Sequence, residues 1–265
     1  MPEVYTFTAG PTPLLISVPH DGRNIPKDIA CQMTEAGLDI PDTDWHVALL
    51  YRFAADIKAT MLVANYSRYV VDLNRPASDE ELYQGQVATG VCPTQTFAGE
   101  PIYTETADLD AAGKSRRLAT YWQPYHERLQ STLAAIKERH GYALLWDAHS
   151  IPSVVPRLFD GELPVLNIGT FDHQSCSAEI ATDIFDVANQ SGFESVLNGR
   201  FKGGYITRHY GDPGKQVFAV QLEIAQRAYM NEVTREFDEA RANRLRATLL
   251  SMLESFRQSA NRRAG

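Results

Sequence analysis

The stretch Tyr142-Ala143-Leu144-Leu145-Trp146-Asp147-Ala148-His149-Ser150 joins an unbroken apolar run to an acid, a histidine and a serine. A short apolar run without polar alternation is typical of a strand that is covered on both faces. Residues 14–18 (LLISV) show a similar pattern and run through Pro19 into His20. The two runs therefore predict a buried sheet with a histidine at the end of each of two strands.

Apolar strand-like runs alternate with helical patterns along the rest of the chain. The predicted strands are Leu14–Val18, Met61–Ala64, Tyr69–Leu73, Tyr142–Trp146, Val165–Gly169 and Val217–Ile224. The predicted helices are Thr43–Lys58, Thr120–His140 with Gly141 as C-cap, Ser177–Gln190 and a last helix from about Glu232. This alternation predicts an α/β fold, with a mixed, largely parallel central sheet flanked by helices, in one domain spanning residues 1–265.

The segment 76–114 differs from the rest of the chain. It is rich in glycine, proline, threonine and acidic residues and shows little periodicity. Loops of this length in compact domains are usually functional or mobile. We therefore predict a loop that acts as a lid.

Composition excludes several classes of partner. The 265 residues are 44% hydrophobic and 22% charged, with a net charge of -8 and no basic run that would follow a nucleic acid or an anionic membrane. The amino terminus has no leader-like pattern, and no apolar run approaches the ~18 residues of a membrane span. We expect a cytoplasmic protein with a small-molecule substrate and no nucleic-acid or membrane partner. The oligomeric state is left open, and the three cysteines are interpreted as structural.

Residues 68–75 (RYVVDLNR) place charged and amide side chains inside an apolar run. As a strand, the segment would carry Arg68, Asp72 and Asn74 on one face, with Arg75 at its end. Arginines there could bind a substrate carboxylate and stabilise an oxyanion. The alternative is an edge strand with solvated arginines paired to Asp72. This segment alone does not decide between the two.

Two imidazoles and a carboxylate suggest a metal-dependent hydrolase. His20 and His149 follow predicted strands, and Glu223 lies between leucine and isoleucine in another, where a carboxylate must be paired or bound. A catalytic zinc usually takes three protein ligands and leaves one position open. In residues 42–46 (DTDWH), Asp42 or Thr43 is a possible helix N-cap, whereas Asp44 could reach a metal. No HExxH motif identifies the ligands.

Six segments in order resemble the N-formylglutamate amidohydrolase family, and together they cover nearly the whole chain. They are SVPHDG (17–22), DTDWH (42–46), RYVVDLNR (68–75), DAHS (147–150), NGRFKGGYITR (198–208) and QLE (221–223). Parts of the pattern are also similar to the aspartoacylase group and to the wider zinc carboxypeptidase architecture, whose hydrolase-like fold we expect here.

The resemblance implies metal-dependent hydrolysis of N-formyl-L-glutamate to L-glutamate and formate in histidine degradation. Zinc is the implied cofactor, as one divalent ion. By the same resemblance, His20 and His149 are metal ligands, Glu223 is the general base, and Arg68 is the catalytic oxyanion ligand.

The carboxypeptidase-like pattern has an acidic ligand three residues after the first histidine, where this chain has Arg23. Asp44 is preferred to Asp42 as the replacement. Asp147 is interpreted as a residue that orients an imidazole.

A glutamate substrate also requires groups that bind its two carboxylates. We assign this role to Asn74, Arg75, Arg200 and Arg208. The Gly203-Gly204 pair allows close backbone approach to a ligand, although a basic surface loop is the alternative interpretation of this segment. Two rival functions are hydrolysis of another acidic N-acyl amino acid and non-catalytic binding of acidic metabolites.

Overall fold

The computed structural model describes residues 3–80, 89–105 and 110–264. Its centre is a seven-stranded sheet in the order β1-β3-β2-β4-β7-β5-β6. The strands are β1 Tyr5–Thr8, β2 Leu14–Val18, β3 Thr60–Ala64, β4 Ala143–Ile151, β5 Leu166–Gly169, β6 Ser195–Leu197 and β7 Val217–Ala225. Strands β3, β2, β4 and β7 are mutually parallel, whereas β1 and β5 run antiparallel to their partners β3 and β7. The predicted mixed, largely parallel sheet is confirmed.

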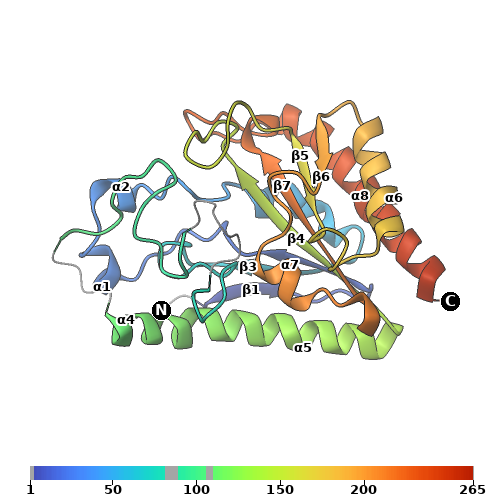
Figure 1. Cartoon of the computed structure of the whole chain (residues 1–265), viewed down its shortest axis with the longest axis horizontal. Coiled ribbons are helices and arrows are strands. Elements are labelled where there is room, and N and C mark those ends of the chain that lie inside the picture. Colours follow the sequence, from blue (N-terminus) through green and yellow to red (C-terminus); the bar gives the residue numbers. More distant parts are fainter. Residues whose placement is uncertain (1–2, 81–88, 106–109, 265) are drawn as a thin grey trace.

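Helices cover both faces of the sheet, with α5 on one side and α6 and α8 on the other (Figure 1). The α-helices are α1 Lys27–Ala30, α2 Glu35–Leu38, α3 Val47–Leu50, α4 Ala111–Arg117, α5 Gln123–His140, α6 Ala178–Gln190, α7 Tyr205–Tyr210 and α8 Glu239–Ala264. The predicted C-cap is confirmed, since Gly141 ends α5 with a φ of 81°; Ser177, predicted as the first residue of its helix, is the N-cap of α6. No helix of the described part of the chain is long and apolar enough to cross a membrane.

The two helix layers explain why the central strands show no polar alternation. In β2, Leu14 and Ile16 pack into the core that includes α6 and α8, whereas Leu15 packs into the core that includes α5. The same alternation continues in β4, where Trp146 faces the first core and Leu145 the second. On the α5 face, however, polar residues replace the apolar ones further along β4, beginning at Asp147. The site therefore begins where this core ends.

The predicted strand Tyr69–Leu73 is wrong. The segment is a buried series of turns, and its groups bond locally or to other loops: Asn74 N–H donates to Asp72 Oδ1, and Asp72 N–H donates to the Val91 carbonyl. Aspartate and asparagine side chains compete with a strand ladder by offering such local partners. The edge-strand alternative also fails, because Arg68 pairs with Asp72 in the interior rather than in solvent.

The predicted helix Thr43–Lys58 is also wrong in extent. Only Val47–Leu50 is α-helical, followed by a 3-10 turn over Tyr51–Ala55. His46 has a φ of 63°, which breaks the helical path. Neither Asp42 nor Thr43 is the cap, since the Asp21 carboxylate accepts from the backbone N–H groups of His46 and Ala48. This capping contact comes from a distant part of the chain.

Other element boundaries shift. The last helix begins at Glu239 rather than about Glu232, whose carboxylate instead accepts from the Ser153 and Arg227 backbones. Strand β4 continues past Trp146 to Ile151, so His149 lies within the strand. The helix predicted from Thr120 extends back through a π-helical segment, Leu118–Trp122, to Ala111. Strands β1 and β6 and helix α7 were not predicted.

The predicted loop 76–114 is thus shorter at its carboxyl end, where α4 begins. Its described parts before α4, residues 76–80, 89–105 and 110, contain isolated bridges but no helix or strand. Residues 81–88 and 106–109 of this loop lie outside the described residues. Its role as a lid stays a prediction.

Candidate metal centre and substrate pocket

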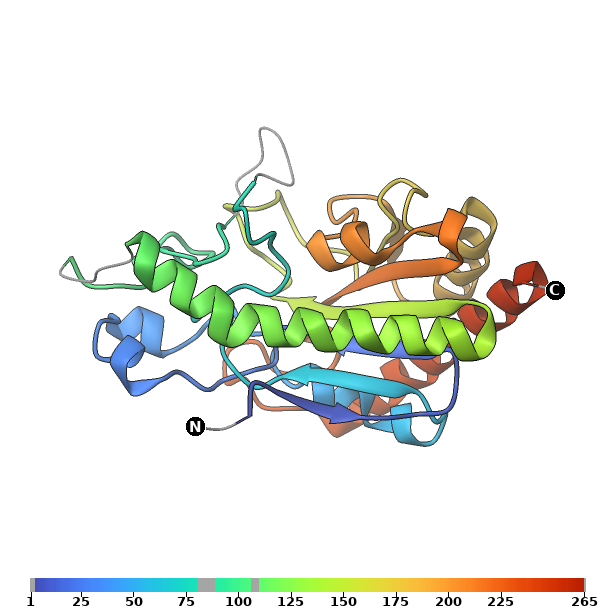
Figure 2. The same cartoon turned by 90° about the horizontal axis from the view of Figure 1, so that it is seen from below.

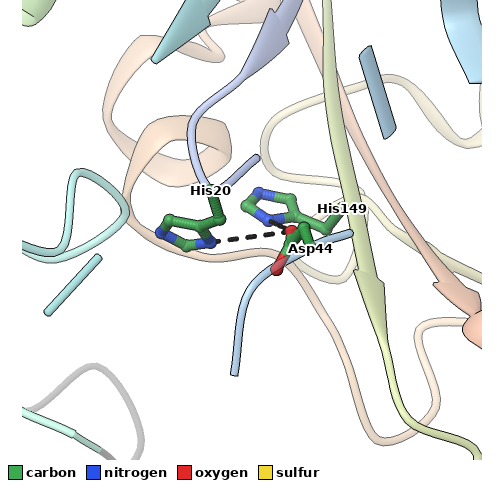
Figure 3. A group of neighbouring side chains, drawn as sticks. All are labelled: His20, Asp44 and His149. Carbon is green, nitrogen blue, oxygen red and sulfur yellow. Dashed lines mark hydrogen bonds and ion pairs between the residues drawn. The ribbon is translucent and has the colours of Figure 1, made fainter. Parts of the chain in front are cut away.

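His20, Asp44 and His149 converge from three separate elements. His20 follows β2, Asp44 precedes α3, and His149 lies near the end of β4. Figure 3 shows both imidazoles directed at the Asp44 carboxylate. Asp44 Oδ2 lies 3.0 Å from His149 Nδ1 and 3.7 Å from His20 Nδ1, and one potential ligand atom from each residue lies within 4.8 Å of the others. All three side chains are buried.

Carboxylates hold the far side of each imidazole. His20 Nε2 lies 2.8 Å from Asp72 Oδ1, and His149 Nε2 lies 3.2 Å from Asp147 Oδ2 and 3.0 Å from Asn74 Nδ2. Among the described residues, no group hydrogen-bonds to the buried His20 Nδ1. Metal-bound histidines typically donate their other ring N–H to a carboxylate in this way, which directs a lone pair at the ion. The donor set of two imidazoles and one carboxylate fits the three protein ligands of a catalytic zinc.

Asp42, the alternative acidic ligand, is already engaged. Its Oδ2 accepts from the Tyr69 hydroxyl at 2.5 Å and from the Phe97 N–H at 2.8 Å. Burial raises the pKa of Asp42 despite these bonds. The geometry therefore supports Asp44.

The electrostatics of the centre favour a cation. Burial alone would raise the pKa of Asp44, but His149 and His20 hold this pKa below its ordinary value. Burial alone would lower the pKa of His149, but Asp147 and Asp44 outweigh it and hold the pKa well above its ordinary value. A buried group of carboxylates that stabilises an imidazolium would also stabilise a bound divalent ion.

Glu223 lies beside the centre, because β7 places it opposite His149 in the register with β4. Burial raises the pKa of Glu223 to about 8, against the opposing effect of His149. A carboxyl group with this pKa is mostly protonated at neutral pH. The positive charge of a bound metal ion would lower this pKa. The position thus suits a group that exchanges protons with a reacting molecule.

Arg68 connects the centre to the pocket. Its Nε and Nη2 donate to Asp72 Oδ2 at 3.3 and 2.9 Å, and its Nη1 lies 3.6 Å from Asp44 Oδ1. The Phe97 ring lies over the guanidinium, 5.0 Å from its central carbon. Arg68 is therefore a fixed, shielded cation beside the predicted metal ligands.

A small pocket opens over this group, with a cavity volume of about 80 Å³. Such a volume suits a ligand much smaller than the drug-sized molecules that fill pockets of about 300–1,000 Å³. Its lining includes His20, Asp44, Arg68, Asn74, Arg75, Thr89, Phe97, His149, Leu158, Arg200, Phe201, Gln221 and Glu223. Every predicted site residue except Arg208 thus lies on one cavity.

The two pocket arginines outside the centre are held at their Nε atoms. Arg75 Nε donates to the Thr89 carbonyl at 2.7 Å, and Arg200 Nε donates to the Leu158 carbonyl at 2.8 Å. Arg208 does not line the cavity: its guanidinium lies over the Phe171 ring, and its Nε donates to the Gly203 carbonyl. The substrate-binding role of Arg208 stays a prediction that the cavity lining does not support.

Asp72 was not predicted as the partner of His20. Asp147 was predicted as an imidazole partner because it lies beside His149 in the sequence. Asp72 reaches His20 across 52 positions of sequence, so no local pattern indicates it. Gln221 and Phe97 also line the pocket without having been predicted.

A buried group of potential metal ligands, a strand-borne glutamate and several arginines line one pocket, an arrangement that suits a hydrolase acting on an anionic substrate. The family model described as N-formylglutamate amidohydrolase matches residues 12–230, and the chain belongs to this family.

Curated relatives agree with this assignment, and a solved structure shares the fold. The chain is 48% identical over 233 residues to an N-formylglutamate deformylase of Pseudomonas putida, covering 88% of this chain and 87% of the relative. It is 47% identical over 257 residues to the N-formylglutamate deformylase of Pseudomonas aeruginosa, covering 96% of each. The crystal structure of N-formylglutamate amidohydrolase from Ralstonia eutropha shares the fold, with a TM-score of 0.82 at 23% identity over 97% of this chain and 98% of that one.

Proposed function

We propose that this protein hydrolyses N-formyl-L-glutamate to L-glutamate and formate, with a zinc-type ion held by His20, Asp44 and His149. The observation that carries the proposal is the convergence of these three buried side chains beside Glu223 and Arg68 on one cavity. The curated relatives are N-formylglutamate deformylases, which supports this substrate. We further propose that the reaction belongs to histidine degradation in the cytoplasm, as the family resemblance implies.

The chain's own residues divide the reaction between them. A bound divalent ion would supply Lewis-acid chemistry that acidifies water and polarises a carbonyl. Glu223 takes a proton from the attacking water and later gives it to the leaving amine of glutamate. Arg68 donates to the formyl oxygen as negative charge develops on it, and Asp72 keeps the guanidinium in place.

The rest of the pocket accounts for an acidic substrate. Arg75 and Arg200 both line the cavity and provide cationic partners for two carboxylates, and the Asn74 amide lies on the same wall. With its ring over Arg68, Phe97 limits the space beside the group that we assign to the carbonyl oxygen. A small acyl group such as formyl fits this restriction better than a larger one. The intact Glu223 in the cavity argues against a purely binding function.

One purified sample tests the proposal. We expect about one zinc-type ion per chain, release of formate from N-formyl-L-glutamate, and loss of both in His20→Ala. N-acetyl-L-glutamate serves as the matched substrate for the rival amidohydrolase function. Metal-free protein with undiminished formate release would refute the metal assignment, and preference for the acetyl compound would refute the formyl assignment.

A further inference from the structure

The segment Ser67–Arg75 carries much of the site, yet it lies outside the sheet. Its buried residues Arg68, Asp72 and Asn74 contact Asp44, His20 and His149 respectively, while their backbone lacks a strand ladder. Buried carbonyl groups need hydrogen-bond donors, and an irregular segment cannot obtain them from regular pairing. The identity of the donors therefore decides how rigidly these side chains are held.

One long helix supplies several of these donors, although the Tyr103 hydroxyl also donates to the Tyr69 carbonyl at 2.5 Å. Arg117 in α4 places Nη1 3.3 Å from the Val70 carbonyl and 3.5 Å from the Tyr69 carbonyl. Two further side chains donate at the other end of the segment: Trp122 Nε1–H to the Arg75 carbonyl at 2.9 Å, and His126 Nε2–H to the Leu73 carbonyl at 2.9 Å. The last two carbonyls flank Asn74 on both sides.

The π-helical segment Leu118–Trp122 explains how one helix reaches the whole segment. Figure 2 shows α4, this segment and α5 as one continuous helix. Residues five apart, such as Arg117 and Trp122, would point about 140° apart on an α-helix. A π turn, closed by i→i+5 hydrogen bonds, brings residues at this spacing onto one side. Pro124, which has no N–H for the α-helical ladder, lies just after it.

Trp122 and His126 also fix each other. They are four residues apart, and their rings stack with centroids 3.8 Å apart and planes 27° apart. His126 is almost fully buried, and its Nδ1 accepts from the Tyr210 hydroxyl at 2.9 Å. Both donors therefore have a restricted geometry and can hold a carbonyl at a defined place.

We propose that Trp122 and His126 are positioning residues: by holding the carbonyls of Arg75 and Leu73 they fix the backbone on both sides of Asn74, and so aim the Arg75 side chain at a substrate carboxylate and keep the Asn74 amide beside His149. The proposal rests on the proposed function of the pocket but assigns a role to residues that do not line it. Neither ring touches the metal centre, so the effect of Trp122, which acts through Arg75, should fall mainly on substrate binding.

Trp122→Phe tests this role, because phenylalanine keeps an aromatic ring for stacking while losing the N–H. We expect kcat/KM for N-formyl-L-glutamate to fall about 3- to 10-fold, the usual weight of one hydrogen bond, chiefly through KM. In an Arg75→Ala background the same change should have almost no further effect, since there is no side chain left to aim. Equal losses in both backgrounds would overturn the proposal, because a merely structural role is additive.

If Trp122→Phe folds poorly, His126→Phe and Asn74→Ala, alone and combined, form a second, independent double-mutant cycle. Tyr51→Phe is the matched control: it deprives the buried Trp146 indole N–H of its acceptor in the other core. This control should lower thermal stability and leave KM unchanged. An increase of KM in the control equal to that in Trp122→Phe would also overturn the proposal.

The proposed function and the positioning role can be refuted separately. Formate release by the wild-type protein decides the proposed function. The dissociation constant for L-glutamate can be measured by calorimetry in the same single and double variants. This comparison tests the positioning role without turnover. Additivity in that measurement would refute the positioning role even if formate release is confirmed.

Discussion

His20 Nε2 lies 2.8 Å from Asp72 Oδ1, while the same aspartate accepts from Arg68 through its other oxygen. One carboxylate therefore orients a predicted metal ligand and a predicted oxyanion ligand at once. Burial would raise the pKa of Asp72, but His20 and the arginines Arg68 and Arg75 hold it well below its ordinary value. Asp72 thus remains an anion between two parts of the proposed machinery.

Asp72→Asn should weaken zinc binding by about 10- to 100-fold, because an amide cannot replace the carboxylate behind the His20 imidazole. The measurement is a competition titration with a chromophoric chelator. Added zinc should restore part of the activity. Asp172→Asn, which removes an exposed ion pair with Lys202, is the control and should leave the affinity unchanged. An unaltered affinity in Asp72→Asn would show that the contact does not orient a ligand.

Glu223→Gln should keep the metal but reduce turnover by about 10²- to 10⁴-fold, since the amide preserves shape while removing the base. Metal content and formate release are measured on the same preparation. Near-normal turnover with full metal content would transfer the role of base to another residue.

Arg75→Lys and Arg68→Ala should fail differently. Arg75→Lys replaces a bidentate fork with a point charge and should mainly raise KM. Arg68→Ala removes a donor to charge that develops in the transition state and should mainly lower kcat. Steady-state kinetics distinguish the two variants. The assays use saturating zinc, because Arg68→Ala also leaves Asp72 without its guanidinium partner and could weaken metal binding through His20. Equal losses in kcat with unchanged KM would contradict the assignment.

Gly204→Ala should disturb the Asn74 wall of the pocket. A Cβ at residue 204 would lie 2.3 Å from Asn74 Nδ2, and the Asn74 amide is held in place because its Oδ1 accepts from the Ile206 N–H. We expect kcat/KM to fall by at least about tenfold. Gly214→Ala is the control, since its nearest contact is the Asp212 carboxylate at 3.3 Å. Kinetics like those of the wild type for Gly204→Ala would show that Asn74 can yield without loss of function.

The stability of the protein should fall below pH 6.5 because of His126. Burial lowers the pKa of His126 to about 3, so between pH 6.5 and 3 the unfolded chain binds a proton that the folded chain excludes. From pH 7 to pH 5 this costs about 2 kcal/mol. Denaturant unfolding at both pH values should show that the free energy of unfolding falls by about 2 kcal/mol more in the wild type than in His126→Phe. An identical pH dependence in the two proteins would refute the burial effect.

Local sequence patterns determined the central strands of the sheet and the place of two histidines at its edge. Apolar runs without alternation predict strands covered on both faces, and β2, β4 and β7 are such strands. His20 and His149 follow from position, because the carboxyl ends of parallel strands meet at one edge of the sheet. Ser177 and Gly141 could be identified as caps because capping depends on residues close in sequence.

Only the tertiary structure decided which polar groups meet. The path of Ser67–Arg75 depends on donors from α4, the π-helical segment and α5, which lie 47 to 53 positions further along the chain and outweigh the strand preference of Tyr69–Leu73. Asp44 and Asp42 have almost the same sequence context, yet one faces the histidines and the other faces Tyr69. Arg208 matches the family pattern but lies outside the cavity. Such contacts depend on three-dimensional distance and burial, which residue type and spacing do not encode.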